Sequence, residues 1–215
     1  MVAKSAQGNQ SAALPRALPG FESIRRYRNA TGISTARILP GEYYVTREDE
    51  AIDTVLGSCV AACIRNPRFS IGGMNHFMLP RPSSSGTDAW ENVAGRAMRY
   101  GSASMEQLIN SVLSAGGTRQ DLEVKIFGGG RVVAKLSDIG ARNLEFVREF
   151  LRQEGLKIAA EDSGDICSRH VQYFPRSGRV RVRHLSARAT ELGAKEQRYL
   201  DRLEQAPVAG EIDLF

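Results

Sequence analysis

Residues 54–80, TVLGSCVAACIRNPRFSIGGMNHFMLP, restrict the fold of this chain more than any other segment. Two short apolar runs, at 60–64 and 74–79, flank a stretch with the turn-forming composition RNPRFSIGG. Apolar runs of this length are typical of strands, and proline and glycine mark the turn between them. The segment therefore predicts a strand, turn, strand unit.

Further strands are expected on both sides of this unit. The charged and apolar residues of LEVKIF alternate, which is typical of a half-buried strand. VQYFPRSGRVRVRHL has the pattern of a β-hairpin whose turn contains Ser177 and Gly178, with valines inward and arginines outward. The predicted strands are 42–46, 52–56, 60–64, 74–79, 122–127 and 156–162, followed by the hairpin at 171–185.

Three helices are expected between and after these strands. Ser104 and Gln107 have capping-box spacing, so we predict a helix that starts there and stops at Gly116. A second helix is predicted from Asp138 to Gly155, and an exposed one over 189–205. The polar stretch 81–95 is expected to be a loop. This mixture of strands and helices indicates an α/β (α+β) fold class.

Length and composition limit the domain organisation. A chain of 215 residues with 42% apolar and 25% charged residues suits one globular domain with tails. We predict a disordered N-terminal tail at 1–23, a folded domain at 24–188, and a C-terminal helix with a loose tail at 189–215. No apolar run is long enough to span a bilayer, and no secretory signal is recognisable, so a cytoplasmic protein without membrane insertion is expected.

Charge and cysteine content exclude some functional classes. Three cysteines do not make an extracellular disulfide framework, so reduced thiols are expected. The net charge of +5 favours acidic partners. Nucleic acid is not expected as a partner because basic and aromatic residues are not interleaved and no known binding module is present.

Cys59 and His76 are the candidate catalytic pair. Cys59 follows a Gly-Ser pair at the end of a predicted strand, where a sharp turn can leave backbone N–H groups free for an oxyanion. A thiol needs a base to become a nucleophile at neutral pH, and an imidazole can form a thiolate–imidazolium pair with it. The alternative is that Cys59 is a small buried apolar residue and that His76 is structural.

Thr54 is a candidate third residue, because a hydroxyl can orient an imidazole as the third group of a triad does. A threonine in a strand can also be there only for its strand propensity. Cys167 and His170 form a rival pair in a more polar segment. The cysteines and histidines lack the spacing of a zinc site, and FGGGRV lacks the Gly-Lys-Ser/Thr ending of a phosphate loop, so no metal and no cofactor is expected.

Several motifs together resemble the chemoreceptor glutamine deamidase (CheD) family of bacterial chemotaxis. They are LGSCVAACIRNP, IGGMNHFMLP, DIGARNLEFVREFL and GLKIAAEDSGD followed by SRHVQYFPRSGRVRV, in order between about residues 40 and 185. The resemblance assigns the nucleophile to Cys59 and the base to His76. The family's threonine falls at Asp53 in a gap-free comparison and at Thr54 one residue later, so both stay open as the third residue.

The resemblance implies a fold of two packed mixed β-sheets flanked by helices, similar to the catalytic domain of cytotoxic necrotising factor toxins. It implies a protein-glutamine glutaminase, a cysteine hydrolase of the amidase type, that converts glutamine to glutamate with release of ammonia. The implied partner is the helical cytoplasmic domain of chemotaxis receptors, and a CheC-type phosphatase is a second one. The alternative is a noncatalytic chemotaxis adaptor that binds receptors or such a phosphatase.

Overall fold

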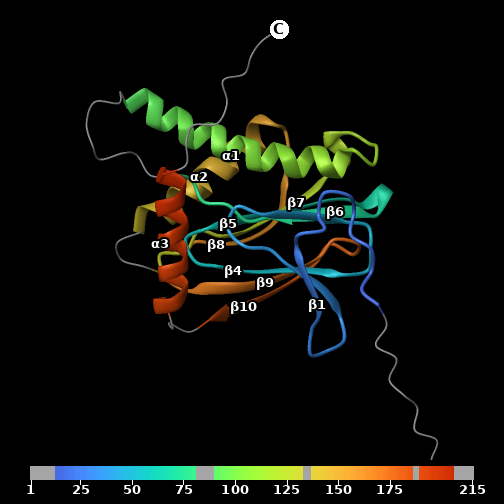
Figure 1. Cartoon of the computed structure of the whole chain (residues 1–215). Helices are drawn as coiled ribbons and strands as arrows, with labels where there is room; N and C mark the ends of the chain where they lie inside the picture. Colours follow the sequence, from blue (N-terminus) through green and yellow to red (C-terminus); the bar gives the residue numbers. More distant parts are fainter. Residues whose placement is uncertain (1–12, 81–89, 133–136, 186–188, 206–215) are drawn as a thin grey trace, which may run out of the picture.

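A computed structural model describes residues 13–80, 90–132, 137–185 and 189–205. Its strands form two five-stranded mixed sheets stacked as layers, with helices on the outside (Figure 1). The predicted α+β class with two packed mixed sheets flanked by helices is therefore confirmed. Within the described residues, none of the helices is both long and apolar enough to cross a membrane.

The first sheet has the strand order β1-β2-β4-β9-β10. Only β2 and β4 run parallel in it, and the other neighbours are antiparallel. β9 and β10 form the predicted hairpin, with Val180 and Val182 half-buried and the intervening arginines exposed. The strands are β1 (Arg25–Arg28), β2 (Ser34–Arg37), β4 (Ala51–Leu56), β9 (Ser168–Phe174) and β10 (Arg179–Leu185).

The second sheet has the order β3-β6-β5-β7-β8. β7 and β8 are parallel and the other pairs are antiparallel. β5 and β6 pair as a strand, turn, strand unit, as predicted, and are joined by the short 3-10 helix η1 (Pro67–Phe69). The second strand was predicted at 74–79, but β6 begins at Ile71 and ends at Asn75, because Ile71, Gly72 and Gly73, which were assigned to the turn, pair with β5. The strands are β3 (Tyr43–Thr46), β5 (Val60–Asn66), β6 (Ile71–Asn75), β7 (Glu123–Gly128) and β8 (Ile158–Ser163), with η2 (Arg119–Asp121) before β7.

Helices α1 (Trp90–Leu113) and α2 (Ser137–Gln153) cover the outer face of the second sheet (Figure 1). Helix α3 (Ala189–Gln205) lies across one end of both layers (Figure 1). Its residues Glu196, Tyr199 and Leu200 are buried, and Leu203 packs against the core. Because these positions recur at i, i+3, i+4 and i+7, they form one face of the helix that packs on the domain. The prediction of an exposed helix at 189–205 is therefore wrong for this face.

Helix α1 starts fourteen positions before the predicted Ser104, at Trp90, and takes in part of the predicted loop at 81–95. The rest of that loop, 81–89, lies outside the described residues. The cause is tertiary packing. A Cβ atom on Gly101 would lie 2.5 Å from Phe146 of α2, so this glycine allows the two helices to approach closely. A glycine that reads as a helix breaker in the sequence is a packing residue here.

The folded unit also extends further toward the N-terminus than the predicted boundary at 24. The ring of Phe21 packs edge-on against Tyr43 and Tyr44, with centroids 5.1 and 5.4 Å away, and is buried. Strands β1 and β2 follow, and neither was predicted. β1 reads RRYR, so it lacks the alternation of apolar and polar residues that identifies a strand in a sequence.

Gly57 and Ser58 carry the chain from β4 in the first sheet to β5 in the second. Asn143 of α2 holds this crossover, because its Nδ2 donates to Ser58 O at 2.8 Å and its Oδ1 accepts from Leu79 N at 2.9 Å. The side chain of Asn143 is fully buried. One amide thus satisfies two buried backbone groups that lie outside the strand ladders.

We expect Asn143→Ala to lower the free energy of unfolding by about 2 kcal/mol or more, because it removes the partner that Ser58 O and Leu79 N have inside the protein. Urea denaturation followed by circular dichroism measures this change. Asn110→Ala on the exposed face of α1 is the matched control, with an expected change below about 0.5 kcal/mol. An equal effect of the two substitutions would contradict the role of Asn143.

Candidate active site

The three residues named from the sequence lie on segments at the junction of the two sheets, and two of them, Thr54 and His76, bond to each other. Thr54 belongs to β4 of the first sheet, Cys59 follows the crossover, and His76 follows β6 of the second sheet. All three side chains are buried. The crossover at Gly57 and Ser58 is what allows Thr54 and Cys59, five positions apart, to belong to different layers.

Thr54 sets the proton position on His76. The Oγ1 hydroxyl of Thr54 donates to Ile38 O at 2.8 Å, since a carbonyl can only accept. The same oxygen lies 2.8 Å from Nδ1 of His76, so it accepts a hydrogen bond from Nδ1–H. In the neutral ring the lone pair is then on Nε2, which is buried and has no hydrogen-bond partner among the described residues. This is the tautomer that a general base needs.

Cys59 and His76 lie on adjacent backbone segments. Val60 and Phe77 form an antiparallel bridge, with N···O distances of 3.0 and 2.9 Å in the two directions. This register places Ala61 opposite His76 and Cys59 opposite Met78. Since alternate residues of a strand share a face, Cys59 and His76 are diagonal neighbours on one face.

Burial keeps both groups neutral in this conformation. It raises the pKa of the Cys59 thiol well above its usual value, and the negative charge of Glu196 and a hydrogen bond to it act in the same direction. Burial also lowers the pKa of His76 to about 3. The structure therefore shows a thiol and a neutral imidazole in a covered site, rather than an ion pair open to solvent.

The backbone around Cys59 forms a cradle of N–H groups, and the carboxylate of Glu196 in α3 fills it. Glu196 Oε1 accepts from Gly57 N at 3.0 Å and from Cys59 N at 3.3 Å. Its Oε2 accepts from Ser58 N at 3.1 Å and Ser58 Oγ at 2.7 Å. Successive N–H groups that converge in this way bind anionic oxygen atoms.

The carbonyl groups of the same residues bond to other parts of the fold. Gly129 N donates to Cys59 O and Gly130 N donates to Gly57 O, both at 2.7 Å. A Cβ atom on Gly128, whose φ is +104°, would lie 2.2 Å from Cys59 O. The run FGGGRV is therefore a tight turn packed against the Cys59 backbone.

Asp53 bonds to groups other than His76. Its carboxylate is bound by Arg37, by the Tyr27 hydroxyl at 3.0 Å and by His170 Nε2 at 3.0 Å. Burial opposes ionisation of Asp53, but hydrogen bonds from His170 and Arg37 hold the pKa of this carboxyl below its usual value. Of the two residues left open as the third site residue, Thr54 is the one that bonds to the imidazole.

The rival pair is divided between two environments. The His170 imidazole is bound to Asp53, and Cys167 is half-buried with Asp165 as its neighbour, at 3.9 Å from Sγ to Oδ2. Two further residues of the site, Glu196 and Tyr199, were not predicted from the sequence, and the Tyr199 hydroxyl bonds to that of Tyr100 in α1. Their only signal is the i, i+3 spacing on a helix, which does not identify the surface that the helix covers.

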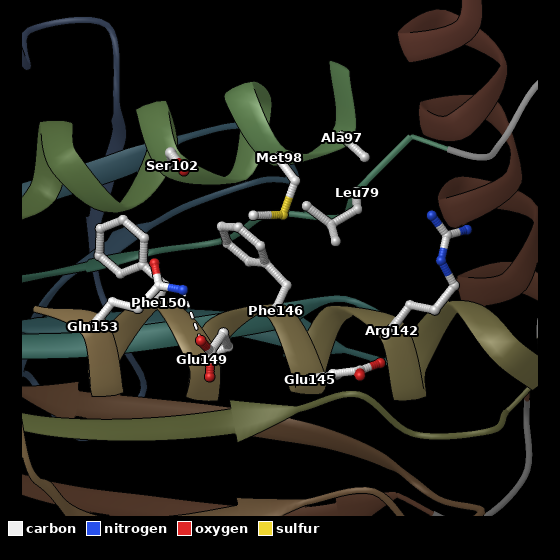
Figure 2. A pocket seen from close by; sticks show the side chains of 10 residues that line it. All are labelled: Leu79, Ala97, Met98, Ser102, Arg142, Glu145, Phe146, Glu149, Phe150 and Gln153. Carbon is white, nitrogen blue, oxygen red and sulfur yellow. Dashed lines mark hydrogen bonds between the residues drawn. The ribbon is translucent and has the colours of Figure 1, made fainter. Parts of the chain in front are cut away.

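A pocket that neither Cys59 nor His76 lines lies between α1 and α2 (Figure 2). It has a volume of about 360 Å³ and an apolar lining that includes Leu79, Met98 and Phe146. Arg142 and Glu149 lie at its rim, and Glu149 accepts from Gln153 at 2.6 Å (Figure 2). Among the described residues, no cysteine or histidine lines this pocket, so the covered site around Cys59 is the better candidate for catalysis.

Comparisons with known proteins give a consistent result. The family model described as "CheD chemotactic sensory transduction" matches residues 78–184. A relative from Halorhodospira halophila is 49% identical over 96% of this chain and 97% of its own length. Relatives from Hydrogenovibrio crunogenus and Herminiimonas arsenicoxydans are 48% and 52% identical over 86% and 84% of this chain, and 96% and 88% of their own lengths. All three are named "Probable chemoreceptor glutamine deamidase CheD".

These relatives and this chain are about half identical over most of their lengths, which is more identity than two proteins need in order to share a fold. The motifs that carried the resemblance, the two mixed sheets and the relatives agree with one another. This chain belongs to the CheD family.

Proposed function

We propose that this chain is a protein-glutamine deamidase that hydrolyses glutamine side chains of chemoreceptors to glutamate and ammonia. One observation carries the proposal. The proposal is supported by the hydrogen bond from Nδ1–H of His76 to Thr54, which leaves Nε2 unprotonated, together with the strand register, in which Cys59 and His76 share a face. The names of the relatives favour this activity over a noncatalytic adaptor.

His76 would accept the thiol proton of Cys59 on Nε2, and Thr54 would keep the ring in place through Nδ1–H. The thiolate then attacks the carboxamide carbon of the substrate glutamine, and a carbon–sulfur bond forms. The carbonyl oxygen becomes an oxyanion in the tetrahedral intermediate. The N–H groups of Gly57, Ser58 and Cys59 are the donors for that oxyanion, since carbonyl contacts on their other side hold them in position.

Collapse of the intermediate breaks the carbon–nitrogen bond, and the imidazolium of His76 protonates the leaving ammonia. The product is a thioester on Cys59. The neutral imidazole next takes a proton from water, which attacks the thioester and releases the glutamate side chain. The net reaction adds one water and removes one ammonia, and it returns Cys59 and His76 to their starting states.

The substrate is proposed to be the helical cytoplasmic part of chemotaxis receptors, so the chain would act in the cytoplasm. A CheC-type phosphatase is the second partner that the resemblance suggests. The exposed arginines of β10 form a basic strip beside Phe174, with Arg179 and Arg181 stacked on its ring at 4.6 and 5.3 Å from the centroid. Such a strip favours acidic protein surfaces.

We expect Cys59→Ala to reduce ammonia release from a receptor cytoplasmic fragment by about 10³-fold or more, because it removes the sulfur that forms the thioester. Intact-mass analysis of the fragment before and after incubation measures the conversion. Cys167→Ala is the matched control and should retain the parent rate. Turnover that survives Cys59→Ala and is lost in Cys167→Ala would assign the nucleophile to the other cysteine.

We expect Thr54→Val to lower the deamidation rate by roughly 10- to 100-fold, because Nδ1–H of His76 loses its acceptor and the ring its orientation. Thr54→Ser keeps the hydroxyl and should restore most of the rate. The pH dependence of Cys59 alkylation by iodoacetamide is the second readout, and it should change in Thr54→Val but not in Thr54→Ser. If Thr54→Val folds normally and its Cys59 alkylation has the same pH dependence as in the parent, this role of Thr54 is contradicted.

A further inference from the structure

The candidate active site is closed in this conformation, and Glu196 of α3 occupies the N–H cradle at Cys59. Cys59 has no exposed surface and His76 is 2% exposed. A substrate glutamine that belongs to another protein has to reach the sulfur of Cys59, so some part of the cover must move. Two side chains of α3 lie near Cys59: Glu196 in the N–H cradle and Tyr199, whose hydroxyl bonds to Tyr100. Leu200 of the same helix is fully buried.

The contacts around the crossover separate into two groups. The carbonyls of Gly57, Ser58 and Cys59 are held by Gly130, Asn143 and Gly129, which belong to the body of the domain. Among the described residues, the N–H groups of the same three positions are held by Glu196 alone. If α3 leaves, the carbonyl contacts keep the crossover in place and the three N–H groups become free donors. The cradle is thus built independently of its present occupant.

The chemistry of the occupant matches the product of the proposed reaction. Glu196 presents a glutamate side chain from a helix, and its carboxylate oxygens lie on the donors that the mechanism assigns to the oxyanion. A glutamate is what a glutamine becomes after deamidation. The same carboxylate contributes to the raised pKa of Cys59, so an occupied cradle also disfavours the thiolate.

We propose that α3 occupies the substrate site of this enzyme, with Glu196 in the position that the side chain of a substrate glutamine takes during catalysis. This inference rests on the proposed function. The surface under α3 then fits a helix that carries a glutamine followed by apolar residues three and four positions later, as Glu196 is followed by Tyr199 and Leu200. A receptor helix must displace α3 before it can react.

The first test gives position 196 the side chain of a substrate. In the full-length chain, Glu196→Gln places a carboxamide on the cradle beside Cys59. Thiolate attack, loss of ammonia and hydrolysis of the thioester should then convert the introduced glutamine back to glutamate within the same molecule, with a mass gain of about one unit. Tandem mass spectrometry of a peptide covering residues 194–199 measures the conversion over time. The double variant Cys59→Ser with Glu196→Gln is the control and should keep its glutamine.

The second test measures the cover without any turnover. Glu196→Ala removes the occupant, and the rate of Cys59 alkylation by iodoacetamide should rise by about tenfold or more, because the carboxylate no longer closes the cradle. Deamidation of a receptor cytoplasmic fragment should accelerate as well. Asp201→Asn is the matched control, since it removes a carboxylate from the same helix outside the cradle, and it should react at the parent rate.

Conversion of the introduced glutamine that depends on Cys59, together with faster alkylation in Glu196→Ala, supports the inference. Retention of that glutamine in a Glu196→Gln preparation that deamidates the receptor fragment overturns the assignment of Glu196 to the substrate position. Equal alkylation rates in Glu196→Ala and Asp201→Asn overturn the inference that Glu196 limits access to Cys59. A further outcome is faster alkylation in Glu196→Ala while no variant releases ammonia from the receptor fragment. It supports the role of Glu196 in covering Cys59 and refutes the proposed function, so failure of the inference and failure of the proposed function are distinguishable.

Discussion

The site depends on how the backbone of Gly57, Ser58 and Cys59 satisfies its hydrogen bonds. These residues pass from one sheet to the other and so leave the strand ladders, and buried backbone groups without partners are costly. Their carbonyls are bound by Asn143 and by the glycine turn at 128–130. Their N–H groups donate to the Glu196 carboxylate of α3. The topology thus leaves a set of N–H donors beside the Cys59 thiol, which the proposed mechanism uses for the oxyanion.

The junction of the two sheets also explains the state of His76. Thr54 comes from the first sheet and His76 from the second, and their hydrogen bond joins the layers. Since Ile38 O takes the hydroxyl proton of Thr54, the imidazole can only donate to that oxygen through Nδ1–H. The orientation and tautomer of the base therefore follow from packing between layers. Burial lowers the pKa of His76 to about 3 and so holds the imidazole neutral. This burial belongs to the covered state of the site.

Much of the fold can be predicted from the sequence. The helix predictions that were wrong involve residues whose packing partners are distant in the sequence. The hairpin and the pairing of β5 with β6 are confirmed because alternation and turn residues are local signals, although β6 begins at Ile71 and not at the predicted position 74. The early start of α1 was missed because the capping-box spacing of Ser104 and Gln107 is a local signal, whereas the close approach of Gly101 to Phe146 of α2 is visible only in the packed chain. The buried face of α3 was missed for the same reason. Glu196 looks like any exposed helical glutamate until its partners, 137 to 139 positions away, are known.

The sequence by itself determined the strand and helix composition, the pairing of Cys59 with His76 as candidates, and membership of the CheD family. It left Asp53 and Thr54 open, because neighbouring strand residues face opposite sides and the sequence does not say which side meets the imidazole. Tertiary structure bonded Thr54, and not Asp53, to the imidazole by packing β4 against the segment after β6, and it alone brought Glu196 to the cradle. Local periodicity reports which face of an element is buried, whereas only the packed chain determines what that face lies against.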